Sequence, residues 1–287
     1  CVYYGKTINE INPKYIRKEI AKLKEYQENA DKNFKKSLEL DDTNRRVMVK
    51  AGKRNAINEA FRVLRTNIDM MLPTTGESHV IMVSSFYPGS GKTVISLNMA
   101  ASMAVKGSKT LVIDLDLRKA SLSEALGKTK EGVATYLNGS TNDIKSCIEN
   151  VQENLDVIKV GTLPPNPSEL LLSQKFKEMI TILKDSYEYI FLDCPPAEIV
   201  VDSAIISSMV DLTVFVVRSG LMDKRNLPYV EELYQSGKYN RMAVVLNAVP
   251  TENAKYGSYG RYGYGSGYGY GYGYTYGSVY GETDSED

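Results

Sequence analysis

The chain has 287 residues, of which 43% are hydrophobic, and it carries 35 basic and 35 acidic side chains. This composition allows one sizeable globular domain with appendages, and the balanced charge excludes a general attraction to nucleic acid. Three scattered cysteines without metal-ligand spacing favour a reducing compartment, and the single histidine, His79, argues against a histidine triad or a zinc site.

Two helices are predicted in the first quarter of the chain. The first is a charged amphipathic helix over about 13–40, with Asn12 as N-cap and Pro13 at its first position. The second runs from about 55 to 71 and is closed by Pro73. No apolar run approaches the roughly 18 to 20 residues that a transmembrane helix needs.

From His79 onward, short β-branched runs alternate with helical stretches such as 94–105 and 168–183. This alternation predicts βαβ units, and therefore an α/β fold with a mostly parallel central sheet and helices on both faces. The predicted strands are 80–84, 110–114, 155–159, 189–193, 212–217 and 243–246.

The residues after Pro250 have a different composition. Ten of the 21 tyrosines lie there, mostly alternating with glycine, and the last six residues carry four acids and no base. With so few aliphatic residues to bury, we expect a disordered tail over 251–287. Its exposed phenols are either a stacking, adhesive segment or nucleophiles presented to an enzyme. The ten tyrosines are Tyr256, Tyr259, Tyr262, Tyr264, Tyr268, Tyr270, Tyr272, Tyr274, Tyr276 and Tyr280.

A candidate phosphate-binding loop follows the first predicted strand and opens a helix, with the sequence Pro88-Gly89-Ser90-Gly91-Lys92-Thr93. In such a loop the backbone N–H groups surround phosphates, the lysine reaches the β and γ oxygens, and the threonine hydroxyl binds Mg²⁺. Phe86 stands where the usual pattern has glycine. The alternative is a Gly-Ser-Gly turn before a helix, which leaves the coincidence of Gly-Lys-Thr with strand and helix unexplained.

Three acids lie at the ends of predicted strands. Asp114 and Asp116 are two residues apart and so share a face of the strand, and Arg118 joins them if the chain stays extended. Asp193 ends another strand. Since ligands gather at the carboxyl ends of parallel strands, these acids predict a Mg²⁺ and general-base cluster. Any one of them could instead only cap a helix or end a strand.

Glu59, Arg62 and Arg65 form a charged stripe on the second predicted helix. Two interpretations remain open at this point, an intrahelical ion-pair ladder or an interaction surface.

Together these residues resemble the bacterial tyrosine kinases (BY-kinases), the P-loop kinases of capsule and exopolysaccharide export. The resemblance covers about 54–250 and the tyrosine tail, and a Pro-Pro-Asn-Pro block within 163–170 is its most specific part. It implies a P-loop kinase domain over 51–250 and an autophosphorylation tail over 251–287. The resemblance does not extend to residues 1–50, and we expect their predicted helix to be a helical extension or linker, or a docking element for a membrane-bound activator.

The resemblance also implies roles for single residues. Asp114 is the implied base for the tyrosine hydroxyl, and Thr93, Asp116 and Asp193 would hold Mg²⁺. The implied catalytic residues are Lys92, Asp114, Asp116 and Asp193. The implied ATP contacts are Pro88, Gly89, Ser90, Gly91, Lys92, Thr93, Val94, Arg118 and, for the adenine, Asn247. The stripe Glu59, Arg62 and Arg65 would mediate ring-like self-association.

The implied function is an ATP- and Mg²⁺-dependent tyrosine kinase that autophosphorylates its tail in trans within a ring-like homo-oligomer. It would regulate capsular or extracellular polysaccharide synthesis and export. The implied partners are other copies of the chain, a transmembrane activator or polysaccharide co-polymerase, and a cognate tyrosine phosphatase, with no nucleic acid. We expect a cytoplasmic protein at the inner face of the cell membrane, held there by such an activator or by an upstream anchor.

Two alternatives compete with this function. A MinD/ParA-type positioning ATPase without kinase activity shares the fold, but such proteins carry an extra lysine near the start of the phosphate loop, where this chain has Tyr87. A positioning ATPase also has no evident use for a tyrosine tail. A scaffold built on stacking Tyr-Gly repeats leaves the acid cluster unexplained.

Overall fold

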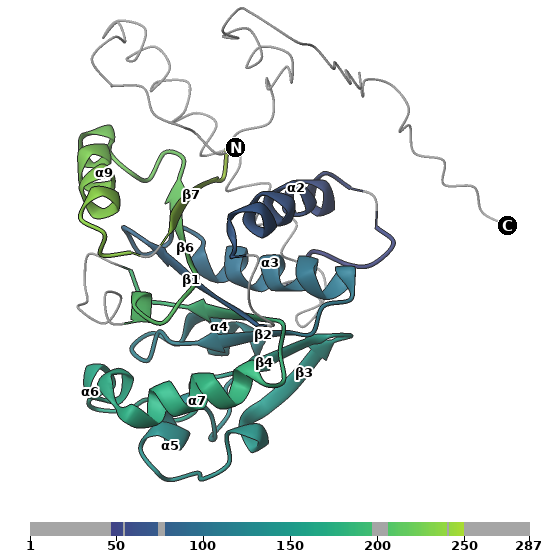
Figure 1. The fold of residues 1–287 in the computed structure, drawn as a ribbon, viewed down its shortest axis with the longest axis vertical. Coiled ribbons are helices and arrows are strands. Elements are labelled where there is room, and N and C mark those ends of the chain that lie inside the picture. Colours follow the sequence, from purple (N-terminus) through teal and green to yellow (C-terminus); the bar gives the residue numbers. More distant parts are fainter. Residues whose placement is uncertain (1–46, 54, 74–77, 197–205, 240, 250–287) are drawn as a thin grey trace, which may run out of the picture. The chain divides into compact units, whose positions relative to one another are not determined.

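The computed structural model describes residues 47–53, 55–73, 78–196, 206–239 and 241–249 (Figure 1). The predicted helix over 13–40 and the tyrosine tail lie outside these ranges.

The described strands form one sheet in the order β3-β4-β2-β5-β1-β6-β7. Neighbouring strands are parallel except for β3 and β4, which are antiparallel. The predicted α/β fold with a mostly parallel sheet is therefore confirmed. The strands are β1 (His79–Ser85), β2 (Thr110–Asp114), β3 (Ile148–Gln152), β4 (Leu155–Ile158), β5 (Tyr189–Asp193), β6 (Leu212–Arg218) and β7 (Met242–Asn247).

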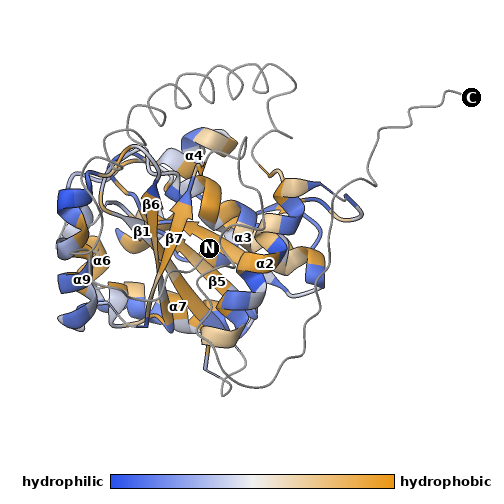
Figure 2. Ribbon diagram, turned by 90° about the horizontal axis from the view of Figure 1, so that it is seen from above, coloured by the Kyte–Doolittle hydropathy of each residue, from blue (hydrophilic) through white to orange (hydrophobic). Residues whose placement is uncertain are grey.

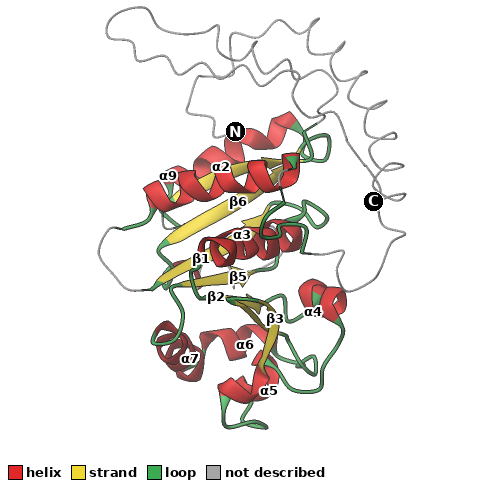
Figure 3. Cartoon of the chain, turned by 90° about the vertical axis from the view of Figure 1, so that its right-hand side faces the viewer, coloured by secondary structure: helices red, strands yellow, loops and turns green. Residues whose placement is uncertain are grey.

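Helices cover both faces of this sheet, with α2 and α3 on one side and α6 and α7 on the other (Figures 1 and 3). The helices are α2 (Ala56–Met71), α3 (Lys92–Lys106), α4 (Ser121–Leu126), α5 (Val133–Leu137), α6 (Pro167–Leu172), α7 (Gln174–Lys184) and α9 (Leu227–Gln235), with 3-10 turns η2 (Ile144–Cys147) and η3 (Lys224–Asn226). Within the described ranges no helix is long and apolar enough to span a membrane.

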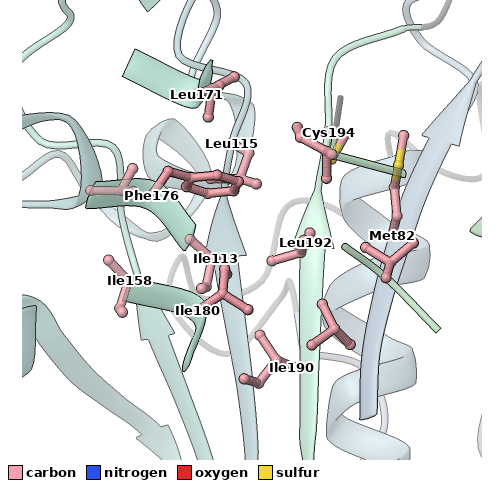
Figure 4. Close-up of a cluster of buried hydrophobic side chains, with 14 of the residues drawn as sticks. Met82, Ile113, Leu115, Ile158, Leu171, Phe176, Ile180, Ile190, Leu192 and Cys194 are labelled. Carbon is pink, nitrogen blue, oxygen red and sulfur yellow. The ribbon is translucent and has the colours of Figure 1, made fainter. Parts of the chain in front are cut away.

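Two hydrophobic cores lie on the two faces of the sheet, because successive side chains of a strand point in opposite directions. Ile113 and Ile190 face Phe176 of α7 (Figure 4). Their neighbours Val112 and Phe191 belong to the core that α3 covers. Strands buried on both sides read as continuous apolar runs. Figure 2 shows these strands in orange between helices that carry blue on their outer sides.

Some elements differ from the prediction. The helix expected over 168–183 is two helices, because Ser173 is extended between them, and its hydroxyl accepts from the Phe176 N–H at 3.2 Å to cap α7. The edge strand β3 was missed because its side chains are exposed or half-exposed, so no apolar run marks it. Helix α9 was also missed, although Pro228 in its first turn is a start signal.

The first described segment, 47–53, is fastened to α3 by one side chain. The Asn98 carbonyl oxygen accepts the N–H groups of Met48 and Val49 at 2.7 and 3.1 Å. Val49 is buried beside it with 3% of its surface exposed.

We expect Asn98→Ala to lower the free energy of unfolding by about 1–3 kcal/mol, because two backbone N–H groups at a buried position lose their acceptor. Denaturant unfolding measures this difference. As a control, Thr181→Ala on the exposed side of α7 should change stability by no more than about 0.5 kcal/mol. Equal stability of Asn98→Ala and wild type would contradict this account of the segment.

Candidate active site

The carboxyl ends of β1, β2 and β5 meet at one edge of the sheet because these strands are parallel neighbours. Asp114 and Asp193 end β2 and β5 and are direct register partners. Their side chains are buried, with 0% and 1% exposed, and Asp116 is 5% exposed. The charge of Asp116 acts on both of the others. The structure thus brings together the three acids that were predicted at strand ends.

The loop between β1 and α3 has the backbone of a phosphate-binding loop. Gly89 and Gly91 have φ angles of +76° and +92°, in the left-handed region that favours glycine. A Cβ atom on Gly91 would lie 2.3 Å from Nδ2 of Asn247, so a side chain here would displace the Asn247 amide. Helix α3 begins directly afterwards at Lys92.

Side chains donate hydrogen bonds to backbone carbonyl groups of this loop. The Ser90 hydroxyl donates to the Tyr87 carbonyl at 2.8 Å. Arg218, at the end of β6, donates to the Gly89 carbonyl at 3.0 Å, and Asn247, at the end of β7, donates to the Ser90 carbonyl at 2.9 Å.

The N–H groups of the same loop are left for another acceptor. Among the described residues, the backbone N–H groups of 89–93 find no protein acceptor. Backbone N–H groups at such positions are normally paired, and a row of them at a helix start binds phosphate oxygens well. The backbone of this loop is therefore suited to bind an anion.

Lys92 brings a positive charge into this buried region. Its side chain is 9% exposed. Burial lowers the pKa of Lys92, while the carboxylates of Asp193 and Asp116 favour its charged form. The ammonium group therefore lies within electrostatic reach of the acid cluster.

Asp193 has the chemistry of a cation ligand. Burial raises the pKa of Asp193 to about 8, the Asp114 charge adds to the rise, and a hydrogen bond from Thr93 opposes it. Among the described residues its Oδ1 atom is buried without a hydrogen-bond partner. An unpaired carboxylate oxygen beside a threonine hydroxyl fits Mg²⁺, which prefers oxygen ligands.

The described part of the chain holds no group of three histidine, cysteine or carboxylate side chains arranged as a metal cage. Mg²⁺ that binds with a nucleotide needs none, since phosphates and water complete its shell. Thr93, Asp116 and Asp193 are thus a fitting set for this ion.

Asp114 is held by a residue that the sequence analysis missed. The N–H and hydroxyl of Ser123 donate to its Oδ2 at 2.8 and 2.7 Å, and the Asp116 N–H lies 3.2 Å from its Oδ1. Burial raises the pKa of Asp114 to about 6, and the Ser123 hydrogen bonds oppose the rise. No motif marks Ser123, because its contact depends on how α4 returns to β2.

Arg118 does not join the buried acids, because the chain is not extended after Asp116. It turns there, and the Ala120 N–H donates to the Asp116 carbonyl at 2.7 Å. The exposed Arg118 side chain instead donates to the Ser168 hydroxyl at 3.1 Å, in the first turn of α6. The Pro-Pro-Asn-Pro block that precedes α6 therefore borders the site.

The remaining predicted ATP contacts surround the loop. Pro88 is exposed and Val94 is 38% exposed at the start of α3. Asn247 was predicted to contact the adenine. In the structure its side chain contacts the phosphate loop through its hydrogen bond to the Ser90 carbonyl. No sequence motif marks Arg218, because its contact with the loop joins residues that are far apart in the chain.

The charged stripe of α2 divides into two parts. Glu59 and Arg62 are exposed and pair with each other, with Nε and Oε2 at 2.9 Å. Arg65 is half-buried and donates to the Ser102 carbonyl of α3 at 2.6 Å. Arg65 thus fastens α2 to α3, whereas Glu59 and Arg62 face outward.

The ten tail tyrosines lie outside the described residues.

The glycine loop, buried lysine and strand-end acids on this parallel sheet define a P-loop nucleotide-binding protein. Residues 78–219 match a family model described as an AAA domain. The chain is 38% identical over 209 residues to tyrosine-protein kinase CpsD of Streptococcus pneumoniae, covering 71% of this chain and 90% of that protein. It is 31% identical to tyrosine-protein kinase wzc of Salmonella typhimurium, covering 72% of this chain and 29% of that protein.

The chain is also similar to solved structures. The kinase domain of Escherichia coli tyrosine kinase ETK superposes with a TM-score of 0.64 at 29% identity, covering 77% of this chain and 82% of that one. The chimerical protein CapA2B2 gives a TM-score of 0.66 at 31% identity, covering 72% of this chain and 91% of that one. The chain therefore belongs to the bacterial tyrosine kinases, a family of P-loop protein tyrosine kinases.

We expect Asp193→Asn to stabilise the nucleotide-free protein strongly at pH 8 and little at pH 4. Because the folded-state pKa of Asp193 is raised, the unfolded chain releases this proton first, and the free energy of unfolding falls as pH rises from about 4 towards 8. The amide removes this loss, which is on the order of 5 kcal/mol at pH 8.

Thermal unfolding without Mg²⁺ at both pH values measures the difference, with Asp185→Asn on the surface as control. Parallel pH profiles for Asp193→Asn and wild type would show that this carboxyl is not a destabilising buried charge.

Proposed function

We propose that this kinase transfers the γ-phosphoryl group of ATP, together with Mg²⁺, to tyrosines of its own tail. The observation that carries the proposal is the row of N–H groups at 89–93 that find no acceptor among the described residues, together with the buried Lys92, on which the charges of Asp193 and Asp116 act. An anion-binding loop next to carboxylates can bind phosphate on one side and, on the other, bind a cation and accept a proton.

The proposed ligands of ATP and Mg²⁺ are residues of the phosphate loop and of the acid cluster. Residues 88–94 and the Lys92 ammonium bind and orient the phosphates, and Asn247 keeps the loop in shape through Ser90. Thr93, Asp116 and Asp193 hold Mg²⁺, which when bound neutralises phosphate charge. Arg118 stands at the rim of the same site.

Asp114 is the proposed base. A tyrosine phenol has a reference pKa near 10, so it gains from a carboxylate that accepts its proton. With a pKa of about 6, Asp114 is ionised at neutral pH. Ser123 and the Asp116 N–H occupy about three of its four acceptor positions, which leaves one for the phenol. Most of the rate would still come from positioning and charge neutralisation.

The proposed acceptors are the ten tyrosines from Tyr256 to Tyr280. The described chain ends at Val249, two residues after Asn247, whose side chain touches the phosphate loop. A coil of about 30 residues has a typical span of about 30 Å, comparable with the width of a domain this size. Both the chain's own site and a neighbour's are in reach, and the resemblance to ring-forming kinases favours the neighbour's.

Self-association is proposed through the outer face of α2. Glu59 and Arg62 lie there beside Val63 and Met70, which are 50% and 79% exposed. Exposed apolar side chains next to an ion pair suit a contact between copies of the chain. Arg65 supports this face from behind through α3.

The proposed cellular role is regulation of capsular or extracellular polysaccharide synthesis and export. It would involve a transmembrane activator or polysaccharide co-polymerase and a cognate tyrosine phosphatase, at the inner face of the membrane. Residues 1–50 would be the extension or linker, 51–250 the kinase domain and 251–287 the acceptor tail. Family membership supports this role, and it disfavours a positioning ATPase without kinase activity.

We expect Lys92→Met to lower tail labelling at least 100-fold, because the phosphates lose their buried countercharge while an unbranched side chain still fills the space. Incubation with MgATP followed by phosphotyrosine detection measures this, and Lys177→Met on α7 is the control. Wild-type labelling by Lys92→Met would refute the assignment of the loop. Phosphate release without any tail labelling in the wild type would favour the positioning ATPase.

Arg62→Ala and Arg65→Ala should differ in what they change. Arg62→Ala removes an exposed group, so stability should change by less than about 0.5 kcal/mol while the oligomer dissociates. Arg65→Ala removes the charged hydrogen bond from α2 to the Ser102 carbonyl and should cost about 1–2 kcal/mol of stability. Light scattering and thermal unfolding measure the two effects. A wild-type oligomer for Arg62→Ala would argue against this interface.

A further inference from the structure

Exposed basic side chains border the acid cluster on two segments that follow β2. Arg118 and Lys119 lie in the turn after β2, and Lys128 and Lys130 lie between α4 and α5. Lys128 pairs with Glu124 at 3.0 Å. Between residues 117 and 131, basic residues outnumber acidic ones by four to two, so this rim is positive although not uniformly so.

Hydrogen bonds place both segments close to the proposed base. The Lys119 N–H donates to Asp116 Oδ1 at 3.0 Å, directly beside the cluster. The Val160 N–H donates at 2.9 Å to the Ser123 hydroxyl, which itself donates to Asp114.

Thr162, two residues after Val160, links the site to the segment between α4 and α5. Its N–H donates to the Lys130 carbonyl at 3.1 Å, and its hydroxyl is 3.2 Å from the same oxygen. Leu163 follows with 51% of its surface exposed. The rim therefore combines positive groups with an apolar one, on segments whose backbone lies close to the acid cluster.

The tail contains one tyrosine that matches this rim. Tyr280 is preceded by Val279 and followed within seven residues by Glu282, Asp284, Glu286 and Asp287. None of the nine other tail tyrosines has an acid within four residues on its carboxyl side, and the first three, Tyr256, Tyr259 and Tyr262, lie near the basic residues Lys255 and Arg261.

We propose that the rim formed by Arg118, Lys119 and Lys130 binds the acidic segment 282–287, and so directs Tyr280 into the site ahead of the other tail tyrosines. This inference rests on the proposed kinase function. In the step that it selects, the Tyr280 phenol oxygen bonds to the γ-phosphorus, the bond from that phosphorus to ADP breaks, and the phenolic proton passes to the Asp114 carboxylate.

The expected preference is modest because exposed ion pairs are weak one by one. Several such pairs together should favour Tyr280 by roughly three- to ten-fold in initial rate, and the preference should shrink at high salt, where exposed charges are screened.

The test follows phosphorylation of each tail tyrosine in the full chain with MgATP by mass spectrometry, at low salt and at 0.5 M salt. Three chains are compared with wild type: a tail with Glu282→Gln, Asp284→Asn, Glu286→Gln and Asp287→Asn, a rim with Lys119→Gln and Lys130→Gln, and the control Lys177→Gln on α7. The readout is the rate at Tyr280 relative to the other tail tyrosines, which cancels any general change in activity.

We expect wild type and the control to label Tyr280 first, and both the tail and the rim variants to lose that preference, as wild type does in high salt. Labelling of other tyrosines with no preference for Tyr280, or a preference that survives in the tail or the rim variant, overturns this inference alone. Absence of phosphotyrosine on every tail residue overturns the proposed function together with it.

Discussion

The arrangement of the whole site depends on two buried carboxylates on neighbouring strands. The parallel register of β2 and β5 places Asp114 beside Asp193, and burial raises the pKa of both. Repulsion by Asp116 adds to the rise at each of them, and repulsion by Asp114 adds to the rise at Asp193. A fold keeps such a pair only where other groups offset it. Ser123 does so for Asp114, and Thr93 with Lys92 does so for Asp193. Within the described residues the Oδ1 atom of Asp193 has no hydrogen-bond partner, and a carboxylate oxygen of this kind suits a cation such as Mg²⁺.

The phosphate loop depends on parts of the chain that its motif does not include. Arg218 and Asn247 hold two of its carbonyls from the ends of β6 and β7. The Asn226 amide donates to the Tyr87 hydroxyl at 2.6 Å, next to the start of α9. With its carbonyls held outward, the loop can direct its N–H groups towards an anion without help from a ligand. The conformation of the loop thus depends on contacts from the ends of β6 and β7.

The buried strands and the closeness of Asp114 and Asp193 were predictable from the sequence. Strands buried on both faces leave apolar runs, so β2 and β5 were predicted with their observed bounds, and parallel strand ends then brought Asp114 and Asp193 together. Contacts between distant segments leave no such mark. The roles of Ser123, Arg65 and Arg218 arise only when helices return to the sheet, and the turn after Asp116 moved Arg118 from the acid cluster to the rim.

The most direct test of the central claim mixes two versions of the full chain with MgATP. One carries Lys92→Met and an intact tail, and the other has an intact site and phenylalanine at all ten tail tyrosines. Phosphotyrosine should accumulate on the tail of the Lys92→Met chain, because a neighbour's phosphate loop and Asp114 act on it. Release of phosphate from ATP with no phosphotyrosine on that tail would contradict the account.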